Sequence, residues 1–267
     1  MYKLRLGKSL SLFRDGFAEQ VKEAAALGFD AMDLDLCALW PHRDKEIEAM
    51  KGLTAGLEIT KNSGLYFNGV HISFGPHWDF SQPDAEKRKE ALDNIREILP
   101  IIDAYHPHCY IIHGSFEPIS DEKRPEHLAA LHDSLVQMTS WTDTPIAVES
   151  LPRTCLFNTA EEGIAIIDAI PRGVFACVDV NLFLKEKSED AVGALGSRII
   201  TTHISDHDYV DERHLLPGKG KIDWMALIGA FERGGYDGVF NYESAGTLAE
   251  IKENYETLFA NYNKGKD

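Results

Sequence analysis

Eight short apolar segments recur along the chain, and each is followed by a stretch with the periodicity of an amphipathic helix. The apolar segments are typical of buried β-strands and comprise Lys3–Leu6, Ala31–Leu36, Tyr66–Ser73, His108–His113, Pro145–Glu149, Val174–Asp179, Ile199–Ile204 and Val239–Glu243. The helical stretches comprise Phe17–Leu27, Asp44–Ser63, Asp84–Ala104, Pro125–Thr139, Ala160–Ala169, Ser188–Leu195, Trp224–Arg233 and Leu248–Tyr262. This alternation predicts an α/β protein with a parallel sheet.

Capping residues support these boundaries. Asp84 and Thr159 stand at the start of two predicted helices, where their side chains can accept hydrogen bonds from free N–H groups. Glycines stand where three other helices should end, namely Gly28, Gly64 and Gly235. The 267 residues give about 33 for each of the eight units, which is typical of a βα repeat. The prediction is a single (β/α)8 TIM barrel domain over residues 1–267.

The last four predicted strands each end on, or next to, a residue that can bind a metal ion. In parallel α/β folds, ligands gather just past the carboxyl ends of the strands. A lone carboxylate there is usually a helix cap or an ion-pair partner, but three converging carboxylates repel one another unless a cation lies between them. The sequence therefore predicts that one divalent metal ion is bound by Glu149, Asp179, His203 and Glu243. Oxygen-rich ligands favour Mn²⁺, and Mg²⁺, Co²⁺ and Zn²⁺ are compatible with the same set.

Two further histidines end the third and fourth predicted strands. His71 and His113 should point to the same rim of the barrel as the four metal-ligand candidates. Three roles stay open for them: hydrogen-bonded residues of the cavity wall, substrate ligands, or ligands of a second metal ion.

Basic residues of two loops are candidates for substrate contacts. Arg153 follows Glu149 closely and can reach a hydroxyl or phosphate group of a substrate. Arg213 and His214 belong to a polar loop after the seventh strand, which either folds over the barrel mouth or is an ordinary surface loop.

Other residues near the predicted strand ends have simpler expected roles. His207 and Asp208 should be solvated loop residues. The aromatic residues Trp40, Trp78 and Phe116 follow the second, third and fourth strands, and ordinary packing is the expected role for each.

Charge and cysteine content narrow the classes of partner. The formal net charge of −16 disfavours nucleic acid and anionic membranes as partners, because both bind proteins through basic surfaces. The cysteines lack metal-binding spacing, so Cys37, Cys109 and Cys177 are expected to be buried free thiols. The first residues lack the apolar stretch of a signal peptide, and no segment is long enough to span a membrane. A cytoplasmic enzyme is the expectation.

Five segments match motifs of a known superfamily. They are AVESLPR (147–153), CVD (177–179), HISD (203–206), HLLPGKG (214–220) and YE (242–243). On these segments the chain resembles the sugar isomerase/epimerase superfamily of xylose isomerase-like barrels, which also includes endonuclease IV-type nucleases. In the ketose epimerases of this group, a Glu–Asp–His–Glu set binds one divalent metal ion. The resemblance therefore implies the same four ligands here, with Glu149 and Glu243 also acting as the acid/base pair.

The chain departs from the family pattern after the sixth strand. The family usually carries D-x-x-H there, whereas Asp179 is followed at that spacing by Leu182. The missing imidazole removes a substrate contact of the epimerases and a metal ligand of the nucleases. Asn181, beside it, is a candidate for a partial substitute.

The resemblance implies proton transfer on a small sugar, sugar phosphate or polyol. The metal ion polarises a carbonyl group, one glutamate removes the neighbouring C–H proton, and the other glutamate returns a proton to the resulting enediolate. The negative charge of the chain favours a neutral substrate over a diphosphate. The alternatives are inosose-type dehydration, an endonuclease IV-like phosphodiesterase and a non-catalytic sugar-binding barrel. Barrels of this type often associate, so a homodimer is compatible with this reading.

Overall fold

Within the described residues, eight strands alternate with eight α-helices. The computed structural model describes residues 1–37, 43–264 and 266, with the backbone alone for 43–51. The strands are β1 Arg5–Ser11, β2 Ala31–Asp35, β3 Tyr66–His71, β4 Cys109–His113, β5 Ile146–Glu149, β6 Val174–Asp179, β7 Ile199–Ile204 and β8 Val239–Tyr242. The helices are α1 Phe17–Leu27, α2 Arg43–Lys61, α3 Ala85–Asp103, α4 Arg124–Trp141, α5 Ala160–Asp168, α6 Ser188–Leu195, α7 Trp224–Arg233 and α8 Leu248–Asn263.

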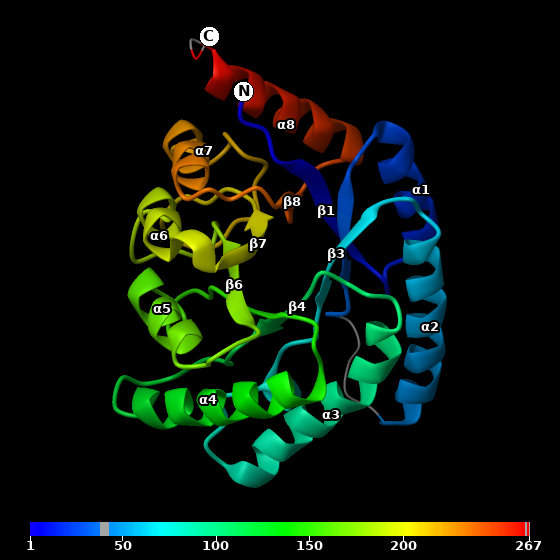
Figure 1. Cartoon of the computed structure of the whole chain (residues 1–267), viewed down its shortest axis with the longest axis vertical. Coiled ribbons are helices and arrows are strands. Elements are labelled where there is room, and N and C mark those ends of the chain that lie inside the picture. Colours follow the sequence, from blue (N-terminus) through cyan, green and yellow to red (C-terminus); the bar gives the residue numbers. More distant parts are fainter. Residues whose placement is uncertain (38–42, 265, 267) are drawn as a thin grey trace.

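The strands close into a barrel in sequence order. Every strand pairs in parallel with its neighbours, and β1 pairs with both β2 and β8. The helices form a ring outside the strands (Figure 1). The predicted (β/α)8 TIM barrel is therefore confirmed. Closure brings the carboxyl ends of all eight strands to one end of the barrel.

The first strand is the main difference from the predicted elements, whose other boundaries agree to within about two residues. The prediction of Lys3–Leu6 was wrong, because β1 continues to Ser11. Its second half contains Lys8, Ser9 and Ser11, which interrupt the apolar pattern but pair with β2 all the same. These polar residues lie at the barrel mouth, where a cavity replaces the apolar core.

The predicted helix caps are present. Asp84 Oδ1 accepts hydrogen bonds from the N–H groups of the first turn of α3, and Thr159 Oγ1 accepts one from Glu162 N. The three glycines at the predicted helix ends all have positive φ, a conformation that costs glycine little. They are Gly28, Gly64 and Gly235, with φ of 80°, 79° and 72°.

The inside of the barrel contains a buried polar layer. Asp33, Asn68, Thr201 and Asn241 are each at most 1% exposed. The amides of Asn68 and Asn241 donate to the Asp33 carboxylate at 2.6 and 2.7 Å. A side chain at Gly69 would meet Asp33 Oδ1 at 2.9 Å, so glycine leaves room for this layer. In most TIM barrels this interior space is filled by Val, Ile and Leu. The polar residues of this layer therefore indicate that the layer supports a polar site.

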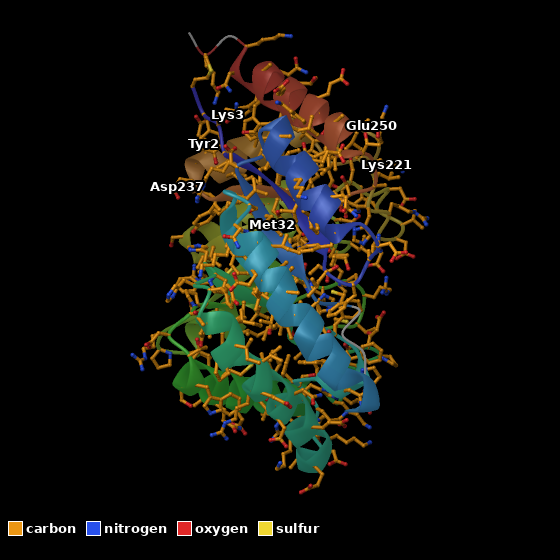
Figure 2. All side chains as sticks on the ribbon, turned by 90° about the vertical axis from the view of Figure 1, so that its right-hand side faces the viewer. Tyr2, Lys3, Met32, Lys221, Asp237 and Glu250 are labelled. Atoms are coloured by element: carbon orange, nitrogen blue, oxygen red, sulfur yellow. The ribbon has the colours of Figure 1, made fainter. Side chains whose placement is uncertain are left out.

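The two ends of the barrel are separated in the side view. Lys221 and Glu250 follow strands β7 and β8 and lie on one side of the molecule, whereas Tyr2 and Asp237 precede strands and lie on the other (Figure 2). The candidate site lies at the first of these ends. Among the described residues, no helix combines the length and apolar composition needed to cross a bilayer.

Candidate functional site

The four metal-ligand candidates lie together at the carboxyl ends of β5 to β8. Glu149 and Asp179 end β5 and β6, His203 is the penultimate residue of β7, and Glu243 directly follows β8. One ligand atom from each of these residues lies within 4.8 Å of the others. The parallel register explains the convergence, since Glu149 lies beside His113, and Asp179 beside His203.

Glu149 is at the centre of three imidazole rings. Its Oε2 atom lies 2.9 Å from His71 Nε2 and 3.0 Å from His113 Nε2. Its Oε1 atom lies 2.5 Å from His203 Nδ1. His71 Nδ1 lies 2.9 Å from the carbonyl oxygen of Ile72, so this nitrogen is the one that carries the proton when the ring is neutral. A neutral His71 therefore presents its Nε2 lone pair to a carboxylate oxygen. Burial opposes a charged ring, but Cys37 and Glu149 raise the pKa of His71 well above its ordinary value, so a proton on Nε2 compensates this contact in the metal-free fold.

His203 shows the same arrangement more strongly. Its Nε2 atom lies 3.3 Å from Asp33 Oδ2, which orients the ring from inside the barrel. Its Nδ1 atom faces Glu149 and also lies 2.8 Å from Glu243 Oε2. Histidines that bind metals typically donate their second N–H to a carboxylate in this way. Asp33 thus completes a carboxylate–histidine arrangement that leaves Nδ1 available for an ion.

Burial and crowding change the acidity of the carboxyl groups. Burial, together with the nearby charges of Glu149 and Glu243, raises the pKa of Asp179 to about 8. Burial also acts to raise the pKa of Glu243, but the charge and hydrogen bond of His203 outweigh it and lower this pKa to about 2. An Asp179 that keeps its proton near neutral pH is a sign of uncompensated negative charge. A divalent cation supplies the missing charge.

The donor set fits a divalent ion. Carboxylate oxygens and one imidazole nitrogen suit Mn²⁺, Mg²⁺, Co²⁺ or Zn²⁺, so the chemistry alone does not choose among them. The cluster can hold such an ion with Glu149, Asp179, His203 and Glu243 as ligands.

A cavity of about 420 Å³ opens above the cluster, a volume in the range of small-molecule sites. Three of the four candidate ligands line it, namely Glu149, Asp179 and Glu243, together with His71 and His113, whereas His203 is fully buried. Apolar residues also line it, namely Phe74, Phe116, Leu151 and Leu182. Phe74 stacks on His113 with ring centroids 4.4 Å apart. Leu182, which replaces the usual histidine, packs with Leu151 and Cys155 instead of offering a ligand.

His214 reaches the site because Asp206 holds the loop after β7. The Asp206 carboxylate accepts hydrogen bonds from Gly218 N at 2.8 Å, Ile222 N at 3.1 Å and Trp224 Nε1 at 2.8 Å. Leu215 also pairs with the backbone of Asp206, and the preceding residue, His214, has its Nδ1 atom 3.1 Å from the carbonyl oxygen of Glu243. His214 lines the cavity, as the interpretation of a loop over the mouth requires.

Arg153 lines the cavity, but its guanidinium group is occupied by acidic loop residues. It contacts Glu117 through two nitrogens, Nε at 3.0 Å and Nη2 at 2.6 Å. Its Nη1 atom lies 2.9 Å from Asp211 and 3.2 Å from Glu212. Arg153 therefore connects the loops after β4, β5 and β7. A substrate contact by this side chain would have to compete with these carboxylates.

Three other loop residues differ from simple expectation. Arg213 is exposed, pairs with Asp208 at 2.8 Å and does not line the cavity among the described residues. The expectation that His207 is solvated was wrong, because the Asp206 hydrogen bonds hold the loop inward and His207 is 0% exposed. Asn181 is buried, and its Oδ1 atom accepts from Arg213 N at 3.1 Å rather than facing the cavity.

The cysteine and aromatic expectations were met in part. Cys109 and Cys177 are buried free thiols, as expected. Cys37 is only half-buried and lines the cavity, with its Sγ atom 3.3 Å from His71 Nδ1. Trp78 is buried as predicted, whereas Phe116 is 40% exposed at the cavity. Trp40 lies outside the described residues.

Sequence reasoning missed several residues that support or line the site. They are Asp33, Asp35 and Cys37 from β2 and its end, and Lys8 and Arg14 from β1 and the loop after it. Asp33 and Asp35 alternate along β2, so their carboxylates share one face of the strand. Two alternating acidic residues in a buried strand are therefore a sequence signal from which these site residues could have been identified.

The comparisons with known proteins agree with this fold. The sequence model of the xylose isomerase-like TIM barrel family matches residues 21–260. The chain belongs to this family. A curated D-psicose 3-epimerase from Enterocloster bolteae is 25% identical over 264 residues, covering 90% of this chain and 83% of that protein.

Solved structures of similar proteins cover almost the whole chain. A D-tagatose 3-epimerase-like protein has a TM-score of 0.80 at 19% identity, covering 99% of this chain and 100% of that one. D-Psicose 3-epimerase from Clostridium cellulolyticum H10, solved with D-tagatose, has a TM-score of 0.75 at 17% identity, covering 98% and 99%. At these identities the structural likeness establishes the fold alone.

Proposed function

We propose that this chain is a divalent-metal-dependent isomerase or epimerase of a small sugar. The observation that carries the proposal is the convergence of Glu149, Asp179, His203 and Glu243 below a cavity large enough for one sugar. The similarity to a D-psicose 3-epimerase supports the sugar class. The loss of the strand-six histidine at Leu182 and the net charge of −16 weigh against an abasic-DNA nuclease.

The four convergent residues would hold the ion. A bound divalent cation polarises a carbonyl oxygen and makes the adjacent C–H more acidic. The remaining chemistry belongs to the side chains of this chain. Glu149 and Glu243 come from strands β5 and β8, so their carboxylates approach the cavity floor from different strands. One is suited to remove the proton and the other to return it, which gives epimerisation or isomerisation through an enediolate.

The surroundings of the two glutamates support this division of work. Glu149 has an almost fully buried side chain, and its contacts with His71 and His113 orient its carboxylate and tune its basicity. The Glu243 side chain is 26% exposed, so it is open to the cavity and can exchange its proton with solvent. The apolar residues Phe74 and Leu182 of the cavity lining limit the access of water to the reacting carbon.

Solvent hydrogen exchange tests the proposal directly. The Mn²⁺-loaded protein is incubated in D₂O with a panel of ketoses, aldoses and polyols, and deuterium incorporation is followed by NMR. We expect deuterium at a carbon next to the carbonyl group. Glu149→Gln and Glu243→Gln should each lower the exchange rate by about 100- to 10,000-fold, the usual contribution of a general acid or base.

A matched control and the product mass complete the test. Glu253→Gln changes an exposed glutamate of α8 and should leave the exchange rate unaltered. Wild-type exchange rates in either Glu149→Gln or Glu243→Gln would rule out the assigned roles. A product lighter by one water molecule would instead identify a dehydratase that shares the first proton-removal step.

A further inference from the structure

A second polar cavity adjoins the first where β8 meets β1. Its volume is about 530 Å³, and it shares Arg14, Asp35, His214 and Glu243 with the cavity above the metal-ligand cluster. Away from this shared boundary, Lys8, Ser11 and Ser244 are among the residues that line it. The two cavities therefore form one elongated space, with the ligand cluster under the first part and a basic, hydroxyl-rich second part.

Two cations of the second cavity lack carboxylate partners. Lys8 is half-buried, and among the described residues its Nζ atom contacts the carbonyl oxygens of Tyr242 and Ser244, both at the long distance of 3.4 Å. Burial lowers the pKa of Lys8, although Glu243 acts in the opposite direction. The Lys and Arg ion pairs among the described residues involve neither Lys8 nor Arg14. Both cations therefore line the second cavity without an ion-pair partner among the described residues.

A hydroxyl group of the same cavity also lacks a partner. Ser244 is only 8% exposed, and its Oγ atom is buried without a hydrogen bond among the described residues. Ser244 follows β8, and α/β barrels often bind phosphate groups with the loops after strands seven and eight. A buried hydroxyl group and a half-buried ammonium group that both lack strong partners point to a ligand rich in acceptor oxygens.

The acidic residues of this space define the direction in which such a ligand lies. Asp35 and Glu243 are at the boundary between the two cavities, beside the metal-ligand cluster, and they repel an anion there. The Lys8 and Ser244 end has no carboxylate among its described lining residues, so this end suits the anionic group. The uncharged carbon chain then extends past Glu243 toward Glu149.

We propose that the second cavity binds the terminal phosphate of a phosphorylated ketose, with Lys8 and Arg14 as cationic contacts and Ser244 as a hydroxyl donor. The placement of the reacting carbons at Glu149 and Glu243 rests on the proposed function, whereas the phosphate contacts do not. The strong negative charge of the chain favours a neutral sugar, but these two local cations reverse that preference at one point of the surface.

Calorimetric titration of the Mg²⁺-loaded protein tests the phosphate contacts without requiring turnover. The probes are matched pairs, D-fructose with D-fructose 6-phosphate and D-ribulose with D-ribulose 5-phosphate. In at least one pair we expect the phosphate ester to bind about 10- to 100-fold more tightly, as a charge-assisted hydrogen bond implies. Lys8→Met and Arg14→Gln should each reduce this ratio by about 10-fold. Arg14 is exposed in a loop, so its variant is informative even if Lys8→Met does not fold.

A control at the same end of the barrel separates a specific contact from a general charge effect. Lys221→Met removes one positive charge from an exposed lysine that lines neither cavity, and the ratio should stay at its wild-type value (Figure 2). Equal affinity for both members of each pair, or an undiminished ratio in both the Lys8 and Arg14 variants, would overturn the proposal. Preferential binding of the ester without any deuterium exchange would keep the phosphate site and reject the epimerase function.

Discussion

The strand ends and the loops of the barrel mouth differ in how their charged side chains are paired. At the strand ends, three carboxylates lie within 4.8 Å of one another around a single imidazole. In the loops beyond, Arg153 contacts Glu117, Asp211 and Glu212, and Arg213 contacts Asp208. The loop charges pair with one another, whereas the strand-end carboxylates are paired with buried imidazoles and, on Asp179, with a proton that a divalent ion can replace.

This difference predicts where substitutions matter. The strand ends are held by parallel pairing, so their side chains keep a fixed spacing that the protein cannot relax to relieve repulsion. The loop pairs are partly exposed, and water screens and replaces them readily. Changes at the strand ends should therefore alter ion binding by large factors, and changes in the loops should alter stability by small amounts.

Asp179→Asn should have the largest effect. The substitution removes a charged ligand from the cluster but keeps the size of the side chain and its position at the end of β6. We expect metal affinity, measured by calorimetric titration, to fall by more than about 100-fold. A loss of about 100-fold is the most that is usual when the mutated residue orients a metal ligand without binding the metal itself. Asp237→Asn, at the opposite end of the barrel, is the matched control (Figure 2). Equal affinities of the two variants would remove Asp179 from the ligand set.

The pH dependence of metal binding should be nearly as large. The pKa of Asp179 is about 8 in the metal-free fold, so this group must release a proton before its carboxylate binds an ion. Affinity should rise by about 10-fold per pH unit between pH 6 and 8 and then level off. Calorimetry in buffers of different ionisation enthalpy measures the released proton directly. An affinity that is constant over this range would contradict the assignment.

The raised pKa of Asp179 weakens metal binding at low pH, but at the same low pH it stabilises the metal-free fold. Asp179 binds its proton more strongly in the folded protein than in the unfolded protein, where its pKa has the ordinary value of 3.8. The resulting stabilisation is complete below about pH 4 and is lost as the pH rises through about 8. Asp179→Asn should flatten this part of the stability profile in chemical denaturation of the metal-free protein.

Asp33→Asn should have an intermediate effect that separates orientation from ligation. Asp33 does not join the ligand set, but it lies 3.3 Å from His203 Nε2. Loss of such an outer carboxylate typically weakens metal binding by about 10- to 100-fold. The histidine itself remains, so saturating metal should restore exchange activity in the variant. Failure of high metal concentration to restore any activity would show that Asp33 has a role beyond orienting His203.

Arg153→Gln should have the smallest effect of the series. The side chain is 40% exposed, and ion pairs of this kind contribute about 1 kcal/mol or less to the free energy of unfolding. We expect a decrease of that size in chemical denaturation, smaller still at high salt, with metal affinity unaltered. A loss of several-fold in metal affinity would instead show that the loop network controls the geometry of the strand ends.

The contrast between strands and loops also describes what the sequence allowed one to predict. Runs such as Val174–Asp179 and Ile199–Ile204 gave the strand boundaries correctly, because buried parallel strands require continuous apolar side chains. Their terminal residues were then placed together by the barrel topology. Lys8 and Asp33 escaped notice because each is a polar residue inside a strand whose role depends on neighbours from other strands.

The chain order of apolar and polar residues by itself determined the barrel and the four candidate ligands. Periodicity is a local property, and closing eight parallel strands leaves only one end at which their carboxyl termini can meet. Only the tertiary structure decided which charges are already neutralised. Arg153 is occupied by three carboxylates, whereas Lys8 has no carboxylate partner in the part of the chain that the structure describes. This depends on distances between loops and strands that are far apart in sequence, and these distances arise only when the barrel closes.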